Sequence, residues 1–366
     1  MKIALIGPGL MPIPPKNWGG VENFMWSYYS VLTGLGHKVD IFNTTDLDSV
    51  VKQVNEGAYD FVHLHYDLYS RFFTKHLKMP FCTTSHYGYI LKPQKWSFGY
   101  NAIDIDNFNA PGIIALSDKI KKNYIDNGYD GWISVLKVGV KVSDFKFNEE
   151  KGNGRALFLG KIEPRKRQTF LAKNLKGMVD IDFAGPIVDQ NFQENETCRY
   201  VGVWDRPYLY EHLTDYSCLV LLSDGEAAPA VVPEALAAGL SIVVSETASA
   251  NLDDKDFVTI LPDGLDDADI IVEAINSQIK NNDSMRSEIR KYADDKFDND
   301  IIVGEYLDMA NKFKGHPFKK SENKFPTLMQ APVYWLSRFY LFCSHNRLCR
   351  YVLDIVRGRN KINGKK

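Results

Sequence analysis

Short apolar runs alternate along the chain with longer amphipathic stretches. The runs are six or seven residues long, with their flanking residues included, and rich in Val, Ile and Leu. They are KIALIG (2–7), HKVDIFN (37–43), DFVHLH (60–65), FCTTSH (81–86), GIIALS (112–117), ISVLKVG (133–139), ALFLGK (156–161), VDIDFAG (179–185), CLVLLSD (218–224), LSIVVSE (240–246) and FVTILPD (257–263). This alternation is typical of βα units in a parallel sheet, whose strands are buried on both faces.

The rhythm breaks once, at the polar, glycine-bearing segment 148–155, which we interpret as a linker. A chain of 366 residues is long enough for about two domains of common size. We therefore expect an α/β protein with two doubly wound, Rossmann-like domains that face each other across a cleft. Ligands of such sheets bind at the carboxyl ends of the strands, so the residues after each strand are the ones to inspect.

The composition is that of an ordinary globular protein, with 45% hydrophobic and 25% charged residues. No stretch approaches the roughly 18 apolar residues of a spanning helix, and the apolar run after Lys2 is too short for a signal peptide. We therefore expect a cytoplasmic protein. Its five cysteines form no C-x-x-C pair, which favours neither a disulfide framework nor a zinc site.

Charge is distributed unevenly along the chain. Between Lys312 and Lys366 lie 13 of the 44 basic residues but only 2 of the 46 acidic residues, which leaves residues 1–311 with a formal charge of −13. An acidic body argues against nucleic acid as a partner.

Two carboxylates stand out in SDGEAAPAVVPEALAAG (223–239). Pro233 occupies what we predict to be the first position of a helix, which places Glu226 in the preceding loop and Glu234 in the opening turn. The residues between them are small or apolar and would let a ligand approach the backbone amides; they include Ala228, Ala230 and Val231. Alternatively, Glu234 only complements the helix dipole and Glu226 is solvated.

A basic segment, GKIEPRKRQ (160–168), directly follows another predicted strand. A run of charges is usually a solvated face. At the carboxyl end of a strand, however, Lys161, Arg165 and Lys166 would face the cleft and could hold a diphosphate.

The first loop, GPGLMPIPPKNWGGVENF (7–24), begins like the dinucleotide-binding fingerprint G-x-G-x-x-G. It carries Pro12 where the third glycine should stand, which excludes that fingerprint. Two delayed glycines, Gly19 and Gly20, instead precede a helix that we expect to begin near Val21.

Three histidines lie at or near predicted strand ends. His63 and His65 share a strand face, but a bare pair without a carboxylate is a poor metal site, and we predict no bound metal. His86 ends the FCTTSH run; taken alone, a histidine there could equally be a core residue.

Taken together, these segments resemble the nucleotide-sugar-dependent retaining glycosyltransferases of family 4. The likeness covers residues 1 to about 312 and rests on the order and spacing of WGGVENF, LGHKVDIF, TTSHYG, IALSDKIKKNY, VGVKVSDF, LGKIEPRK and the Glu226-to-Glu234 element. It implies the GT-B fold. We expect an acceptor domain (1–148), a donor domain (152–300), a helix that returns to the first domain (301–312), and a basic aromatic C-terminal extension (313–366).

The resemblance also implies roles for individual residues. Lys161 and Lys166 would bind the donor diphosphate and stabilise the charge that develops on it, without a metal or other cofactor. Glu234 would bind the ribose hydroxyls, Glu226 would lie beside the donor sugar, and His86 would approach the transferred sugar. The partners are then a UDP- or GDP-sugar and a carbohydrate or glycolipid acceptor.

Gly19 and Gly20 would let the backbone approach the donor phosphates, while the loop before them borders the acceptor. Where the family has Glu-Gly-Phe-Gly, this chain has Glu226 followed by Ala-Ala-Pro, and Pro229 has no amide hydrogen to offer a ligand. Two other functions stay open: a nucleotide-sugar epimerase of the same fold, and a non-catalytic glycan- or nucleotide-binding protein.

The C-terminal extension lies outside the resemblance. Arg347, Arg350, Asp354 and Arg357 are spaced to share one helix face. Such a helix could lie on an anionic membrane surface through its aromatic side, or pack back on the acidic N-terminal domain.

Overall fold

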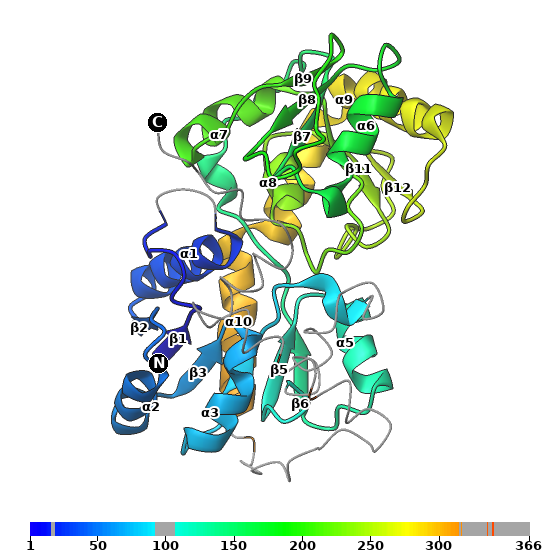
Figure 1. Cartoon of the computed structure of the whole chain (residues 1–366). Coiled ribbons are helices and arrows are strands. Elements are labelled where there is room, and N and C mark those ends of the chain that lie inside the picture. The colour runs from blue at the N-terminus through cyan, green and yellow to red at the C-terminus, as the bar shows by residue number, and fades with distance from the viewer. Residues whose placement is uncertain (16–18, 92–106, 315, 317–334, 336–338, 340–366) are drawn as a thin grey trace, which may run out of the picture.

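The computed structural model describes residues 1–15, 19–91 and 107–314, together with positions 316, 335 and 339. Within these residues the chain forms two parallel sheets of six strands each, one above the other in Figure 1, with helices packed on both. The predicted architecture of two Rossmann-like units is confirmed. The four charged residues singled out in the C-terminal extension, Arg347 to Arg357, lie outside the described residues.

The N-terminal sheet has the strand order β2-β1-β3-β4-β5-β6. Its strands are β1 (Lys2–Ile6), β2 (Lys38–Phe42), β3 (Phe61–Leu64), β4 (Cys82–Thr83), β5 (Gly112–Ala115) and β6 (Trp132–Val135). Its helices are α1 (Gly20–Gly34), α2 (Leu47–Glu56), α3 (Ser70–His76) and α5 (Asp118–Asp126).

The C-terminal sheet has the strand order β12-β11-β10-β7-β8-β9. Its strands are β7 (Ala156–Leu159), β8 (Ile181–Ala184), β9 (Cys198–Tyr200), β10 (Cys218–Leu221), β11 (Ser241–Ser245) and β12 (Val258–Leu261). Its helices are α6 (Gln168–Asn174), α7 (Arg206–His212), α8 (Val231–Ala237) and α9 (Ala268–Phe297), and α10 (Asn299–Lys314) follows them.

Burial explains why the sequence pattern located these strands. In the central strand β1, the four residues Ile3–Ile6 are all buried, so the run is continuously apolar. The strand β2 lies at the edge of the sheet and pairs with a neighbour along one edge only. Its residues are exposed or half-buried, mostly in alternation, and none is fully buried. The short strand β9 was not predicted, since its three residues include the charged Arg199 and carry no apolar run.

Two helix starts refine the sequence prediction. Helix α1 begins at Gly20, close to the expected Val21. Helix α8 begins at Val231, so Pro233 is its third residue and not its first, as we had predicted. The correction leaves Glu234 in the first turn, where its backbone amide bonds to the carbonyl oxygen of Ala230.

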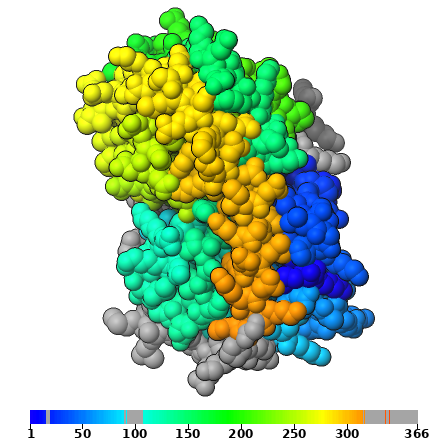
Figure 2. Space-filling model, turned by 180° about the vertical axis from the view of Figure 1, so that it is seen from behind, coloured from blue at the N-terminus to red at the C-terminus, as the bar shows by residue number. Residues whose placement is uncertain are grey.

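The last described helix, α10, leaves the C-terminal sheet and packs on the N-terminal one. Figure 2 shows α9 and α10 running down the back of the molecule, from one half to the other. Tyr306 meets Tyr28 of α1 and Phe61 of β3 edge to face, at centroid distances of 5.2 and 5.6 Å. At the end of α10, the Phe313 ring lies 5.0 Å from Trp132. The N-terminal core thus contains a helix that follows the whole C-terminal sheet in the sequence.

Among the described residues, no helix is both long enough and apolar enough to cross a bilayer.

Candidate functional site

The carboxyl ends of the two sheets meet where residue 88 touches residue 226. A Cβ atom on Gly88 would lie 2.7 Å from the backbone carbon of Glu226, so only glycine allows the two loops to approach this closely. The next residue, Ala227, is buried in the hydrophobic cluster of the N-terminal half. The loop that carries His86 is therefore packed against the loop that carries Glu226.

Glu226 forms ion pairs with two residues of the basic segment, Arg165 and Lys166. Its Oε1 lies 3.0 Å from Nη1 of Arg165 and 3.5 Å from Nζ of Lys166. Burial would raise the pKa of this carboxyl, but Lys166 and Arg165 outweigh it and hold the pKa below its usual value. Glu226 is thus a half-buried carboxylate that carries its charge between two cations.

Two glycines, Gly160 and Gly185, allow the start of the basic segment to pack closely against the neighbouring strand end. A Cβ atom on Gly185, the residue after β8, would lie 2.2 Å from the carbonyl oxygen of Gly160, the residue after β7. The chain can therefore turn tightly at this strand end, and Lys166 reaches back to within 3.1 Å of an ideal Cβ position on Gly160. Lys161 is exposed at the same strand end.

Arg165 is also held by its neighbours. Its Nη2 donates to Oε1 of Glu163 at 2.8 Å, and its Nη1 donates to the carbonyl oxygen of Gly225. Its own carbonyl oxygen accepts a bond of 2.8 Å from the amide of Asp224. The segment after β7 and the loop after β10 are therefore joined before any ligand arrives.

Glu234 is paired with a residue that the sequence did not single out. Nη1 of Arg206 donates to Oε1 of Glu234 at 2.5 Å. The same guanidinium lies over the ring of Tyr210 and donates to its hydroxyl oxygen at 3.0 Å. Arg206 begins helix α7, whose N-cap residue Asp205 accepts from the amide of Tyr208. An Asp-Arg-Pro sequence that opens a helix was the available signal, but it carries no chemistry by itself.

The residues between the two carboxylates contact the other half of the molecule. Ala228 and Ala230 are half-buried and pack against the N-terminal cluster, whereas Val231 packs against the C-terminal one. This stretch therefore lines the junction of the two halves.

The two early glycines have different surroundings. A Cβ atom on Gly19 would lie 2.9 Å from Oε2 of Glu22 and 3.2 Å from Sδ of Met11. On Gly20, no atom of the described residues lies within 4 Å of that position. Glu22 is buried in the first turn of α1, and burial raises its pKa. The sequence reasoning missed this carboxylate at the helix N-terminus.

His86 sits in an aromatic environment. Its ring packs edge-on against Phe24 at 5.1 Å, and its Nε2 lies 3.3 Å from Nδ1 of His65. Burial lowers the pKa of His86 to about 4, so the ring is neutral at pH 7. It can exchange hydrogen bonds with a ligand but carries no charge to it.

Asp67 is a second carboxylate that the sequence reasoning missed. It is buried two residues after His65, near the same strand ends. Burial raises its pKa to about 7, against a hydrogen bond from Ser85. In sequence it looks like an ordinary helix-start residue, because nothing local shows its burial.

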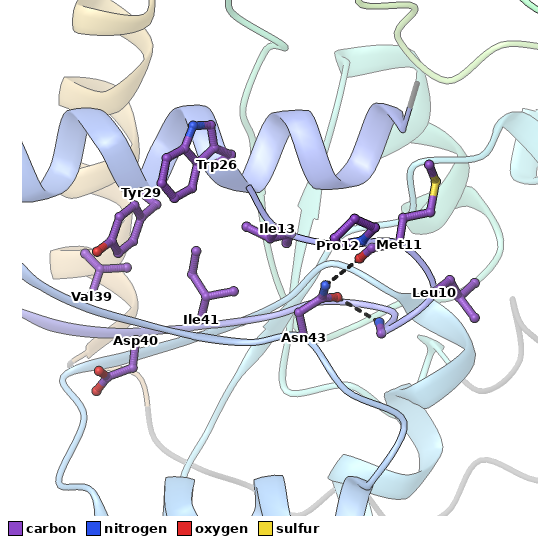
Figure 3. Close-up of a pocket in the computed structure, with 11 residues that line it drawn as sticks. Leu10, Met11, Pro12, Ile13, Trp26, Tyr29, Val39, Asp40, Ile41 and Asn43 are labelled. Carbon is purple, nitrogen blue, oxygen red and sulfur yellow. Dashed lines mark hydrogen bonds between the residues drawn. The ribbon is translucent and has the colours of Figure 1, made fainter. Parts of the chain in front are cut away.

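A depression of about 780 Å³ opens beside the edge strand β2 (Figure 3). Its walls come from the loop 9–13, from α1 and from β2, and they include Ile13, Trp26, Tyr29, Val39 and Ile41. Asn43 holds the loop in place, donating to the carbonyl oxygen of Met11 at 2.7 Å and accepting from the amide of Gly9 at 2.8 Å. None of the predicted donor-site residues lines this depression.

With this geometry established, comparison with solved structures identifies the fold. A sucrose-phosphate synthase from Thermosynechococcus elongatus superposes with a TM-score of 0.71 at 14% identity, over 85% of this chain and 98% of that one. The chain has the GT-B fold.

Two further GT-B structures agree. Anabaena HepE, solved with UDP and glucose, gives a TM-score of 0.67 at 15% identity, over 85% of this chain and 100% of that one. The lipopolysaccharide outer core galactosyltransferase WaaB gives 0.63 at 14% identity, over 86% and 100%. No protein-family model matches the sequence, and no curated protein matches it.

Proposed function

We propose that this GT-B protein is a retaining glycosyltransferase that moves a sugar from a nucleoside-diphosphate sugar to a hydroxyl group of a carbohydrate or glycolipid acceptor. One observation carries the proposal: the loop of His86 packs against Glu226, which is itself held by Arg165 and Lys166. The groups that we assign to the sugar and to the phosphates therefore lie close together where the two sheets meet. The sequence resemblance to family 4 and the names of the structural neighbours point to the same activity.

The leaving diphosphate is the group that most needs stabilisation. Lys166 and Arg165 are held beside Glu226 by ion pairs, and Lys161 is exposed just after the end of β7. Cations fixed in place before the reaction stabilise developing negative charge without reorganisation during it. We assign these three residues to the diphosphate and propose no metal ion in the reaction. Gly20, near whose Cβ position no other described residue lies, would let the N-terminus of α1 approach the same phosphates.

The carboxylates are assigned to the donor's sugars. We propose that Glu234, held by Arg206, binds the ribose hydroxyls, and that Glu226 orients the transferred sugar. Glu226 is not assigned as a nucleophile; in the proposed reaction the acceptor attacks from the face that the diphosphate leaves. His86, neutral at pH 7, hydrogen-bonds the transferred sugar.

Nucleotide binding is tested first by thermal shift with UDP, GDP, UDP-glucose and a GDP-hexose. A ligand that binds only the folded state raises its melting temperature by mass action. UDP-glucose is the leading probe, because HepE structures contain UDP and UDP-glucose. If no nucleotide or nucleotide sugar shifts the melting temperature, the proposed donor site is wrong.

Lys166→Ala tests the diphosphate role against Lys173→Ala, an exposed lysine in the following helix α6. We expect Lys166→Ala to lower the rate at which nucleotide is released from the sugar donor by about 100-fold, while the affinity for the sugar donor changes little. This is the size of effect seen when one preorganised hydrogen-bond donor to a developing charge is removed. Lys173→Ala should match the parent. Equal rates in both variants would remove Lys166 from the reaction.

Glu234→Ala should weaken nucleotide binding by roughly tenfold, as expected for a lost charge-assisted hydrogen bond. The control is Glu196→Ala, at an exposed position, which should leave nucleotide binding unchanged.

Product analysis separates the proposed function from its two alternatives. An epimerase returns an isomerised nucleotide sugar without releasing nucleotide, and a non-catalytic protein binds the donor and leaves it unchanged.

A further inference from the structure

His65 is buried between two other histidines at the end of β3. Its ring centroid lies 3.8 Å from that of His63 and 5.6 Å from that of His86. Phe24 packs against both His65 and His86, at 5.5 and 5.1 Å. Of the three, only His86 has a place in the proposed reaction. The hydrogen-bond geometry of the other two determines what His86 can offer a ligand.

All three rings are neutral at pH 7. Burial lowers the pKa of His63 and of His65 well below the usual value, and lowers that of His86 to about 4. The 3.3 Å contact between Nδ1 of His65 and Nε2 of His86 therefore joins two neutral rings. In such a pair one nitrogen carries the shared proton and the other accepts it.

His63 shows which arrangement the core prefers. The hydroxyl of Thr84 donates to the carbonyl oxygen of Ile114 at 3.0 Å, so its oxygen accepts from Nε2 of His63 at 2.8 Å. The proton of His63 is thus on Nε2. Its Nδ1 is buried and has no hydrogen-bond partner among the residues that the structure describes, so this nitrogen carries a lone pair and not a proton.

The same reasoning fixes the direction of the next bond. Nε2 of His65 is buried, and within the described part of the chain it has no hydrogen-bond partner. A buried N–H group without an acceptor costs more free energy than a lone pair without a donor. The proton of His65 is therefore on Nδ1, from which it points at Nε2 of His86.

We propose that His65 is a positioning residue for His86: it donates from Nδ1 to Nε2 of His86 and fixes that ring as the Nδ1–H tautomer. This inference rests on the proposed function, in which His86 meets the transferred sugar. His86 then presents an N–H donor to a sugar hydroxyl oxygen, in one orientation. Without His65 the ring could adopt either tautomer, and part of the population would present a lone pair instead.

The test combines NMR with kinetics on the full chain. Ring nitrogen shifts of ¹⁵N-labelled protein at pH 7 report which nitrogen of each histidine carries the proton. We expect protonated Nδ1 for His65 and His86, and protonated Nε2 for His63. His65→Phe should replace the uniform Nδ1–H signature of His86 by a mixture of the two tautomers, whereas His63→Phe, an equally buried neighbour that does not bond to His86, should leave it uniform.

Kinetics then show whether the bond matters. With UDP-glucose as the donor, His65→Phe should lose about tenfold in kcat with little change in KM, the equivalent of one lost hydrogen bond. His65→Asn, whose amide nitrogen can occupy the place of Nδ1, should recover most of that loss and keep His86 in the Nδ1–H form.

Finding Nε2–H on His86 in the parent protein, or an unchanged Nδ1–H signature in His65→Phe, would overturn the assignment. The NMR result does not depend on turnover. If the parent protein turns over no nucleotide sugar, the proposed function fails while the tautomer assignment can still stand.

Discussion

At the scale of single residues, burial sets opposite protonation behaviour at the end of β3. Burial keeps His63, His65 and His86 neutral by lowering their pKa values. It also raises the pKa of Asp67 from 3.8 to about 7, so this carboxyl is partly protonated at neutral pH. These four groups contribute to the pH dependence of stability with opposite signs.

The signs follow from linkage. The unfolded chain protonates its histidines near pH 6.5 while the folded protein does not, so their contribution to the unfolding free energy falls as the pH drops below 6.5. Folded Asp67 takes up its proton near pH 7 and the unfolded residue near 3.8, so acidification across this window stabilises the fold. Asp67 therefore offsets part of the histidine loss.

Asp67→Asn removes this offset. Between pH 7 and 4 the variant should lose stability more steeply than the parent, by up to about 1.4 kcal/mol per pH unit. Urea unfolding at four pH values across this range measures the slopes. Asp308→Asn, at an exposed position of α10, is the control and should leave the slope unchanged. Parallel slopes for Asp67→Asn and the parent would contradict the raised pKa.

At the scale of elements, the contact between the His86 loop and the Glu226 loop depends on one missing side chain. Gly88→Ala would place a Cβ atom 2.7 Å from the backbone of Glu226, which must move apart from it. A displacement of about 1 Å at a site can cost roughly 100-fold in rate, so we expect donor turnover to fall by about that factor. The measurement is kcat with UDP-glucose.

The control is Gly304→Ala in α10, where no described residue outside the helix's own backbone comes within 4 Å of the added atom. It should leave turnover unchanged and stabilise the protein by about 1 kcal/mol, because alanine favours a helix over glycine. Full activity in Gly88→Ala would show that the close approach of the two loops is not needed.

At the scale of the whole molecule, the N-terminal core depends on α10, a helix that follows the C-terminal sheet in the sequence. Phe313 is buried between Phe61 and Trp132, at centroid distances of 5.7 and 5.0 Å. Phe313→Ala should cost about 3–5 kcal/mol, as for other large-to-small changes in a core. Ile301→Ala, at a position of the same helix that is 42% exposed, should cost far less. Thermal or urea unfolding compares the two, and equal losses would contradict the packing of α10.

The sequence by itself determined the two parallel sheets and most of their strands. Buried parallel strands are continuously apolar, and this signal is local, as in β1 and β10. It also selected Lys166, Glu226 and His86 as candidates, because each follows a strand, where loops converge, and because each matches a position in the motifs that resemble family 4. Such information is present within a few neighbouring residues.

The tertiary structure alone decided the rest, since it depends on contacts between distant segments. Arg206 becomes a candidate site residue only because the fold places it beside Glu234, 28 positions later in the sequence. Asp67 becomes one only because the fold buries it. Arg286 reads as a surface charge of α9, yet it is fully buried and donates to the carbonyl oxygens of Asn148 and Thr214. A local sequence pattern indicates which secondary structure a residue favours and which face of that element it lies on. Its charge state and its partners depend on the residues that the fold packs against it.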